Sequence, residues 1–208
     1  KRILDFFFFP TGTDTISNKH LVLMFKRVVR VLPFPNYIGS IQKLNNKING
    51  SVYNSISIPY RKNNPSVRKK DIEKINLWTK SILDYKKTTI SLNKEEELYG
   101  YQKLKALGVN QNKFITFHCR DSVYMQSIAP NTDWSYHDYR DSSIKNYLLA
   151  VEKMTKQNYF CLRIGKGVNE KLKISNPMII DYAISNHRTD KMDIFLLSKN
   201  KFIICSDT

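Results

Sequence analysis

Residues 93–208 of this 208-residue chain predict an α/β fold with a Rossmann-like, doubly wound parallel sheet. Two observations lead to this prediction. Short apolar runs that favour strands alternate with longer stretches that favour helices, which is typical of a parallel sheet with crossover helices. The apolar runs are also continuous, as expected of strands that are covered on both faces. Residues 1–92 predict a more helical, loop-rich region, so we place a domain boundary after residue 92.

Local signals predict the elements of the second region. A helix begins after Asn93, because the carboxylates of Glu95–Glu97 meet the positive end of the helix dipole. It ends at Gly108, a residue type that commonly closes a helix. Asp141 or Ser142 would cap a later helix. In chain order, the other predictions are a strand at 114–118, a polar loop at 120–142, a helix at 143–157, strands at 159–164 and 178–182, a helix at 189–198 and a strand at 202–205.

Weaker patterns predict the first region. A helical stretch runs up to Pro33, which cannot continue a helix. Its apolar face consists of Leu21, Phe25, Val28 and Leu32. Residues 36–70 are polar and predict loops with one strand-like stretch at 55–59, and residues 71–85 predict a second amphipathic helix. The chain starts without a methionine and stops just after an apolar run, so we expect a fragment that is truncated at its C-terminus.

The composition is that of a soluble globular protein with a large basic excess. Hydrophobic residues make up 41% and charged residues 25%, and the formal net charge is +16. Residues 1–112 carry most of this charge, with 20 basic against 8 acidic side chains. Such an excess suits nucleic acid, an anionic membrane surface or a polyanionic acceptor. Dispersed lysines in a chain rich in Lys, Asn and Ile equally indicate compositional drift.

The cysteines and the lengths of the apolar runs indicate in which cellular compartment the protein is found. Cys119, Cys161 and Cys205 lie inside strand-like runs, and their odd number and spacing fit neither a disulfide framework nor a zinc site. The aromatic run Phe6–Phe9 is far too short to span a bilayer, and no later stretch approaches about 20 apolar residues. We therefore expect a cytoplasmic protein, with peripheral contact at the inner membrane as an open alternative.

Polar side chains follow three of the predicted strands, at the position where ligands bind a doubly wound sheet. The first strand ends in His118-Cys119-Arg120-Asp121. Arg120 presents a planar, permanently charged fork to a phosphate or carboxylate, and His118 could donate to a phosphate or orient a sugar. The alternative is structural. In that case Arg120 forms an ion pair with Asp121 or Asp141, and the imidazole of His118 makes its hydrogen bonds within the protein core.

Two further strand ends and one loop carry weaker signals. After the second strand, Gly165 allows close backbone approach to a ligand and Arg163 or Lys166 could meet an anion, although a plain turn has the same pattern. Ser206 and Thr208 follow the last strand and are hydroxyl residues of the kind that bind phosphate. The loop 131–142 combines aromatic and charged side chains, which suits sugar recognition and could supply a general base. Its candidates are His137, Asp138, Tyr139 and Arg140.

Several stretches of the chain carry a family likeness. They are Phe114–Tyr124, His137–Asp141, Ile144–Tyr147, Ile179–Ala183, His187–Asp190, Met192–Leu196 and, more loosely, Asp5–Phe8, Ser17–Lys19 and Lys26–Arg27. Together they resemble a family of bacterial glycosyltransferases, which is in turn similar to the O-fucosyltransferase-like enzymes of the two-domain GT-B type. The likeness covers most of the chain and is strongest over residues 95–208.

The resemblance implies roles for individual residues. The O-fucosyltransferase-like enzymes carry a His-x-Arg motif at a strand end, matched here by His118 and Arg120. Their arginine contacts the donor diphosphate and is needed for catalysis. They also carry an aspartate that opens a helix and a strand that ends in phosphate-binding hydroxyl residues. The implied donor contacts in this chain are Asp193, Ser206 and Thr208. Asp121 stands where those enzymes usually carry a second basic residue, so the donor stays open.

The resemblance implies transfer of a sugar from a nucleotide-sugar donor to a glycan or lipid-linked acceptor, as in surface polysaccharide synthesis. It also implies inversion by direct attack of an acceptor hydroxyl, without a cofactor. No Asp-x-Asp pair stands at a strand end, so no metal site is predicted, and Arg120, backbone amides and hydroxyls would stabilise the leaving diphosphate. Two alternatives stay open. One is an inactive relative of these enzymes that binds a nucleotide sugar. The other is a basic nucleic-acid-binding protein. Because that function would leave the α/β half of the chain unexplained, we expect no nucleic acid partner.

Overall fold

The computed structural model describes residues 6–7, 17–28, 30–31, 44, 90–110 and 113–206. The chain divides into two compact units, of which one comprises Lys1–Thr13 and Lys26–Ser91 and the other comprises Asp14–Phe25 and Leu92–Thr208. The predicted strand-like stretch at 55–59, the predicted helix at 71–85 and Thr208 lie outside the described residues. The short segment before residue 26 therefore belongs with the α/β unit rather than with the rest of the first region.

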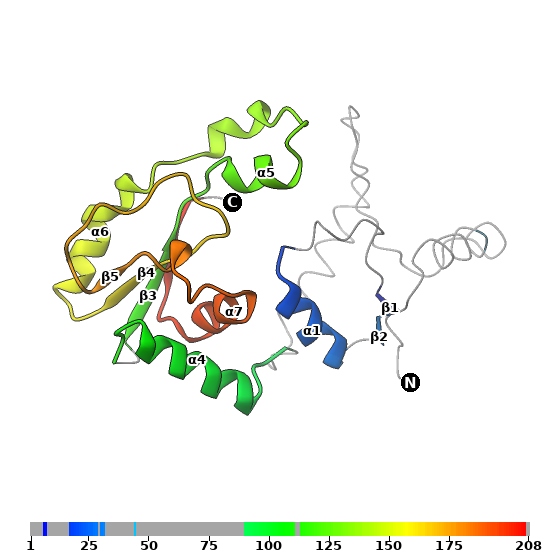
Figure 1. Ribbon diagram of the computed structural model, residues 1–208, viewed down its shortest axis with the longest axis horizontal. Helices are drawn as coiled ribbons and strands as arrows, with labels where there is room; N and C mark the ends of the chain where they lie inside the picture. Colours follow the sequence, from blue (N-terminus) through cyan, green and yellow to red (C-terminus); the bar gives the residue numbers. More distant parts are fainter. Residues whose placement is uncertain are drawn as a thin grey trace, which may run out of the picture. The chain divides into compact units, whose positions relative to one another are not determined.

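The second unit is built on a four-stranded parallel sheet, which confirms the general α/β class. Its strands are β3 (Phe114–His118), β4 (Phe160–Arg163), β5 (Ile179–Ile180) and β6 (Ile203–Cys205). Their order across the sheet is β5-β4-β3-β6, and every neighbouring pair is parallel. Figure 1 shows β3 in green next to the red β6. The first four residues of β3 are buried, because this strand is paired on both edges and covered on both faces.

Helices cover both faces of this sheet (Figure 1). They are α4 (Lys94–Ala106), α6 (Lys145–Thr155) and α7 (Asp190–Lys199). Successive side chains of a strand point to opposite faces, and β3 follows this rule. Phe114 belongs to a core cluster with Leu104 of α4 and Phe195 of α7. Ile115 belongs to a second cluster with Val151 of α6. The sheet therefore has an α4/α7 side and an α6 side.

The ends of α4 follow the signals in the sequence. Asn93 accepts a hydrogen bond from the Glu96 N–H at 2.8 Å, and the Glu96 carboxylate accepts one from the Asn93 N–H at 2.8 Å. This reciprocal pair is a capping box. At the other end, Gly108 has a φ of +82° and its N–H donates to the Lys105 carbonyl at 2.9 Å. Gly108 thus closes the helix in the left-handed conformation that glycine adopts without strain.

The prediction of a polar loop at 120–142 is wrong in part, because this stretch contains helical turns. They are α5 (Val123–Ile128) and the 3-10 helix η2 (Ser135–Arg140). None of the residues of α5 is fully buried, so this helix leaves no apolar periodicity in the sequence. The predicted cap of α6 is also wrong. Ile144 precedes α6 without a side-chain cap, and Asp141 lies in an extended stretch before it, where it faces Arg120.

The remaining described elements are short. They are β1 (Phe6–Phe7), α1 (Lys19–Val28), β2 (Arg30–Val31) and the 3-10 turn η3 (Tyr182–Ile184). The helix α1 ends at Val28 rather than near Leu32, because Arg30 and Val31 pair with β1 as a parallel strand. Among the residues that the structure describes, no helix is long and apolar enough to cross a membrane.

Candidate functional site

The carboxyl ends of β3, β4 and β6 meet at one edge of the sheet. His118, the last residue of β3, is in register with Cys205 of β6, and Phe117 is in register with Arg163 of β4. The residues that follow these strands are therefore neighbours in space. Ligands of open parallel sheets bind at such an edge. We refer to the residues around His118 on the α4/α7 side of this edge as the His118 site.

His118 lies against the turn that follows β4. Its Nδ1 lies 3.1 Å from the Ile164 carbonyl oxygen. The next residue, Gly165, has a φ of +154°, and a Cβ atom there would lie 3.5 Å from His118 Nδ1 and 3.3 Å from Val168 Cγ1. Glycine therefore permits both the backbone angle and the close approach of the turn to the imidazole. The close backbone approach predicted at Gly165 is made, within the chain, toward the His118 side chain.

Arg188 holds the same turn from the segment just before α7. Its Nε donates to the Gly165 carbonyl at 3.0 Å, and its Nη2 donates to Asp193 Oδ2 at 2.7 Å. The fully buried Tyr182 donates its hydroxyl to Asp193 Oδ1 at 2.9 Å. Burial raises the pKa of Asp193, while Arg188 and the Tyr182 hydroxyl act in the opposite direction. Both oxygens of Asp193 are thus used inside the protein, and this residue acts on the His118 site through Arg188.

Arg120 is held by its main chain at the end of β3. Its N–H donates to Ser206 Oγ at 3.0 Å, and its carbonyl accepts from the Ser142 N–H at 3.0 Å. The first of these bonds places Ser206, which follows β6, beside Arg120. The guanidinium Nε lies 3.8 Å from Asp141 Oδ1, and 15% of the Arg120 side chain is exposed. The structural alternative of an Arg120–Asp141 pair is therefore present, at a separation longer than a hydrogen bond.

Asp121, the other structural partner considered for Arg120, ties two loops together. Its Oδ1 accepts from the Val123 N–H at 3.2 Å, and its Oδ2 accepts from the Asn169 N–H at 3.1 Å. The loop after β3 is thereby joined to the loop after β4. Two amide dipoles partly compensate the negative charge of this carboxylate. This compensation reduces the repulsion that Asp121 would exert on an anion near Arg120.

Arg163 is not brought to His118, in contrast to the expectation that it contacts a donor. Its side chain is 2% exposed, and its Nη1 donates to the Glu170 carbonyl at 2.6 Å and lies 3.5 Å from Asp181 Oδ2. Strand alternation is the physical reason. Cys161 packs on the α6 side, so Arg163, two residues further along β4, points to the same side.

A polar hollow of about 310 Å³ opens on that α6 side. Its charged lining consists of Asp121, Asp141, Glu170 and the buried Arg163. Because three carboxylates line it against one guanidinium that is already paired, the hollow is unsuited to a diphosphate. Within the described ranges, no group of three or more His, Cys, Asp or Glu side chains is placed to hold a metal ion.

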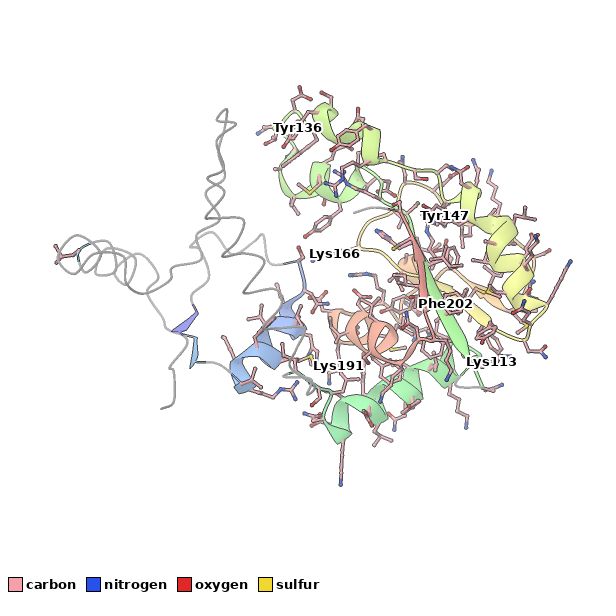
Figure 2. All side chains as sticks on the ribbon, turned by 180° about the vertical axis from the view of Figure 1, so that it is seen from behind. Lys113, Tyr136, Tyr147, Lys166, Lys191 and Phe202 are labelled. Atoms are coloured by element: carbon pink, nitrogen blue, oxygen red, sulfur yellow. The ribbon has the colours of Figure 1, made fainter. Side chains whose placement is uncertain are left out.

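Two basic residues of the edge are Arg188, to which the sequence prediction gave no role, and Lys166, which it named beside Arg163 as a residue that could meet an anion. Arg188 lies just before α7, and Lys166 stands between two glycines. Lys166 Nζ donates to the Ser17 carbonyl at 3.0 Å, and the Tyr124 hydroxyl donates to Ser17 Oγ at 2.9 Å. Figure 2 shows Lys166 beside the N-terminal end of α1. The sequence pattern that pointed to Lys166 was a basic residue between two glycines, directly after a predicted strand.

The loop candidates lie on η2, on a different turn from His118. Tyr139 is 83% exposed and Asp138 is exposed, whereas Arg140 is half-buried. The side chain of His137 lies outside the described residues. The structure therefore presents a polar and aromatic surface on η2, and this turn is connected to Arg120 through Asp141.

Comparisons of the chain with protein-family models, with curated proteins and with solved structures found no match. A functional proposal therefore starts from the geometry of the sheet edge.

Proposed function

We propose that the protein is a glycosyltransferase that transfers a sugar from a nucleotide-sugar donor to a glycan or lipid-linked acceptor. The observation that carries the proposal is the assembly of His118, Arg120 and Ser206 at the carboxyl ends of two paired parallel strands. The resemblance matches His118 and Arg120 to the His-x-Arg motif and Ser206 to the phosphate-binding hydroxyl residues. The proposal includes that the α/β unit is the Rossmann-like donor half of a GT-B enzyme. A parallel sheet with helices on both faces is compatible with this assignment.

Arg120 stabilises the leaving diphosphate in this function. Negative charge develops on the diphosphate as its bond to the anomeric carbon breaks, and a fixed guanidinium nearby lowers the barrier. The main chain of Arg120 is held by Ser206 on one side and Ser142 on the other, so the guanidinium starts from a rigid strand end. Lys166 and Arg188 add positive charge at the same edge. The reaction is inverting and metal-independent in this proposal.

The cellular setting follows from the same proposal. The reaction takes place at the cytoplasmic face of the inner membrane, in the synthesis of a surface polysaccharide. The basic excess of residues 1–112 would favour docking on anionic lipid. Liposome binding that weakens as salt is added would support this setting, and salt-independent or absent binding would contradict it.

The test is thermal denaturation of the protein with GDP, UDP, dTDP and CMP sugars. We expect one nucleotide class to raise Tm by roughly 5 °C at about a hundredfold excess over Kd. Arg120→Ala should lose this shift, whereas Lys156→Ala, an exposed basic residue just after α6, should keep it. If no nucleotide sugar shifts the Tm, the proposal is wrong. Binding without hydrolysis or transfer would instead favour the inactive nucleotide-sugar-binding relative.

A further inference from the structure

We infer that His118 contacts the donor diphosphate as a doubly protonated imidazolium, so that the binding of the donor takes up a proton. The inference rests on the proposed function, because it requires an anionic ligand at the His118 site. It follows from the hydrogen bond between His118 Nδ1 and the carbonyl oxygen of Ile164.

This bond determines which ring nitrogen carries the proton. The carbonyl oxygen can only accept, so at 3.1 Å the hydrogen lies on Nδ1 of His118. In a neutral imidazole the other nitrogen, Nε2, is then an acceptor without a proton. A diphosphate oxygen is also only an acceptor, so a neutral His118 cannot donate a hydrogen bond to it. Protonation of Nε2 lets the ring donate to Ile164 and to the diphosphate at the same time.

The turn that sets this tautomer is held at several points. Ile164 directly follows β4, and its N–H donates to the Phe117 carbonyl of β3 at 3.0 Å. The Gly165 carbonyl accepts from Arg188 Nε at 3.0 Å, and Arg188 is in turn bound to Asp193 at 2.7 Å. The Ile164 carbonyl therefore cannot swing away from the ring without breaking these contacts. The opposite tautomer of His118 would lose its hydrogen bond and gain none within the turn.

Charged groups approach the His118 site from three elements. The loop after β3 contributes Arg120 and Asp121, and the turn after β4 contributes Lys166, whose Nζ donates to the Ser17 carbonyl. Arg188 just before α7 and Asp190 and Asp193 in its first turn complete the set. Two of the carboxylates lie within 3.8 Å of Arg188, and the third accepts backbone hydrogen bonds. A diphosphate adds about two negative charges at the ring, which favours the imidazolium over its state in the empty site. By linkage, the donor then binds more tightly as the pH falls.

The experiment is calorimetric titration with the nucleotide sugar that shifts the Tm, in two buffers of different ionisation enthalpy. An intact nucleotide sugar is used because both its phosphates are esterified and do not titrate over the range tested. We expect the Kd to fall about tenfold from about pH 8.5 to about pH 5.5, the range in which imidazoles change charge, with uptake of up to about one proton. Circular dichroism at each pH confirms that the protein stays folded.

Two variants test whether His118 is the group that takes up the proton when the donor binds. His118→Gln should bind with the affinity that the wild type has at high pH, and its Kd should not depend on pH. His187→Gln, which alters a half-buried histidine in the segment before α7, is the matched control and should keep the wild-type pH dependence. If His118→Gln does not fold, His118→Asn takes its place, because its shorter amide can still donate to the Ile164 carbonyl.

The outcomes separate this inference from the proposed function. A Kd that is independent of pH, without proton uptake, overturns the inference and leaves the proposed function standing. Tighter binding at high pH also overturns it and indicates that neutral His118 accepts a hydrogen bond through Nε2. Wild-type pH dependence in His118→Gln, or its loss in His187→Gln, places the proton elsewhere and overturns it as well. If no nucleotide sugar binds at any pH, the proposed function fails together with the inference.

Discussion

Arg163 and His118 end neighbouring strands of one sheet, yet they point to opposite sides of it. On the α6 side, Arg163 is 2% exposed and is held within 3.5 Å of Asp181. On the α4/α7 side, His118 rests against the Gly165 turn and keeps part of its side chain accessible. A position at the carboxyl end of a strand is therefore not sufficient for ligand binding. The parity of the residue within the strand decides whether its side chain reaches the core or a ligand.

The two sides of the sheet also differ in the charged side chains near the strand ends. Three carboxylates and the already paired Arg163 line the hollow on the α6 side, whereas Asp190 and Asp193 near the His118 site both lie within 3.8 Å of Arg188. Arg120 stands between the two, because its N–H binds Ser206 while its guanidinium lies 3.8 Å from Asp141. An anionic ligand is thus favoured on the α4/α7 side of the edge.

The largest effect that we predict concerns Arg163 itself. Arg163→Ala leaves Asp181 without its guanidinium, although the Oδ1 of Asp181 is already buried without a hydrogen bond. We expect the free energy of unfolding to fall by about 3 kcal/mol, as measured by urea denaturation. Arg120→Ala is the matched variant and should lose less than about 1 kcal/mol while its nucleotide affinity falls. Equal losses of stability would remove the contrast between the two arginines.

A second prediction concerns the turn against His118. Gly165→Ala should destabilise the protein by about 2 kcal/mol, because alanine is strained at a φ of +154° and its Cβ would press on Val168 and the imidazole. The nucleotide affinity should fall with it, since His118 is displaced. Gly108→Ala is the control, because its φ of +82° is also positive but its Cβ would meet no atom within 4 Å. Loss of nucleotide affinity in both variants would show that backbone strain alone is responsible.

A third prediction concerns the anchor of Arg188. Tyr182→Phe removes the hydroxyl that donates to Asp193 and should cost about 1–2 kcal/mol of unfolding free energy at neutral pH. Burial already raises the pKa of Asp193, and loss of this donor raises it further. A carboxyl whose pKa is raised in the folded state binds more protons there than in the unfolded state, so its contribution to stability grows as the pH falls. The cost should therefore be smaller at about pH 5 than at about pH 7.5.

Urea denaturation at both pH values checks this third prediction. Tyr159→Phe is a suitable control, because Tyr159 is a half-buried tyrosine that packs against Phe202 and Lys113. Its cost should be the same at both pH values. An equal cost for Tyr182→Phe at the two pH values would mean that Asp193 does not depend on the Tyr182 hydroxyl.

The smallest effect that we predict concerns the thiols. Cys119 and Cys161 are buried in the α6-side core, whereas Cys205 is exposed on β6. Burial raises the pKa of Cys161 to about 12 and also raises that of Cys119, so both stay protonated and shielded at about pH 8. Ellman's reagent should modify one thiol of the native protein quickly and the other two only on unfolding. Cys205→Ser should lack the fast phase, and two fast thiols in the wild type would contradict the burial of the α6 side.

Signals between near neighbours in the chain predicted much of the fold. The strand predicted at 114–118 has these bounds in the structure, and α7 was predicted within one residue at each end. Asn93 and Glu96 form the cap that their spacing indicated. The short helical turns α5 and η2 were missed, because they are too short to repeat an apolar pattern.

The sequence by itself determined where the strands of the sheet lie, the cap of α4 and the stretch His118–Asp121 as the place to look for a site. Only the tertiary structure decided which side chains meet there. The His118–Ile164 contact joins residues 46 positions apart, and the contact between Arg120 and Ser206 joins residues 86 positions apart. Local patterns record the period of a strand but not the side on which it is covered. The burial of Arg163 and the accessibility of His118 therefore became visible only when the parallel strands were paired.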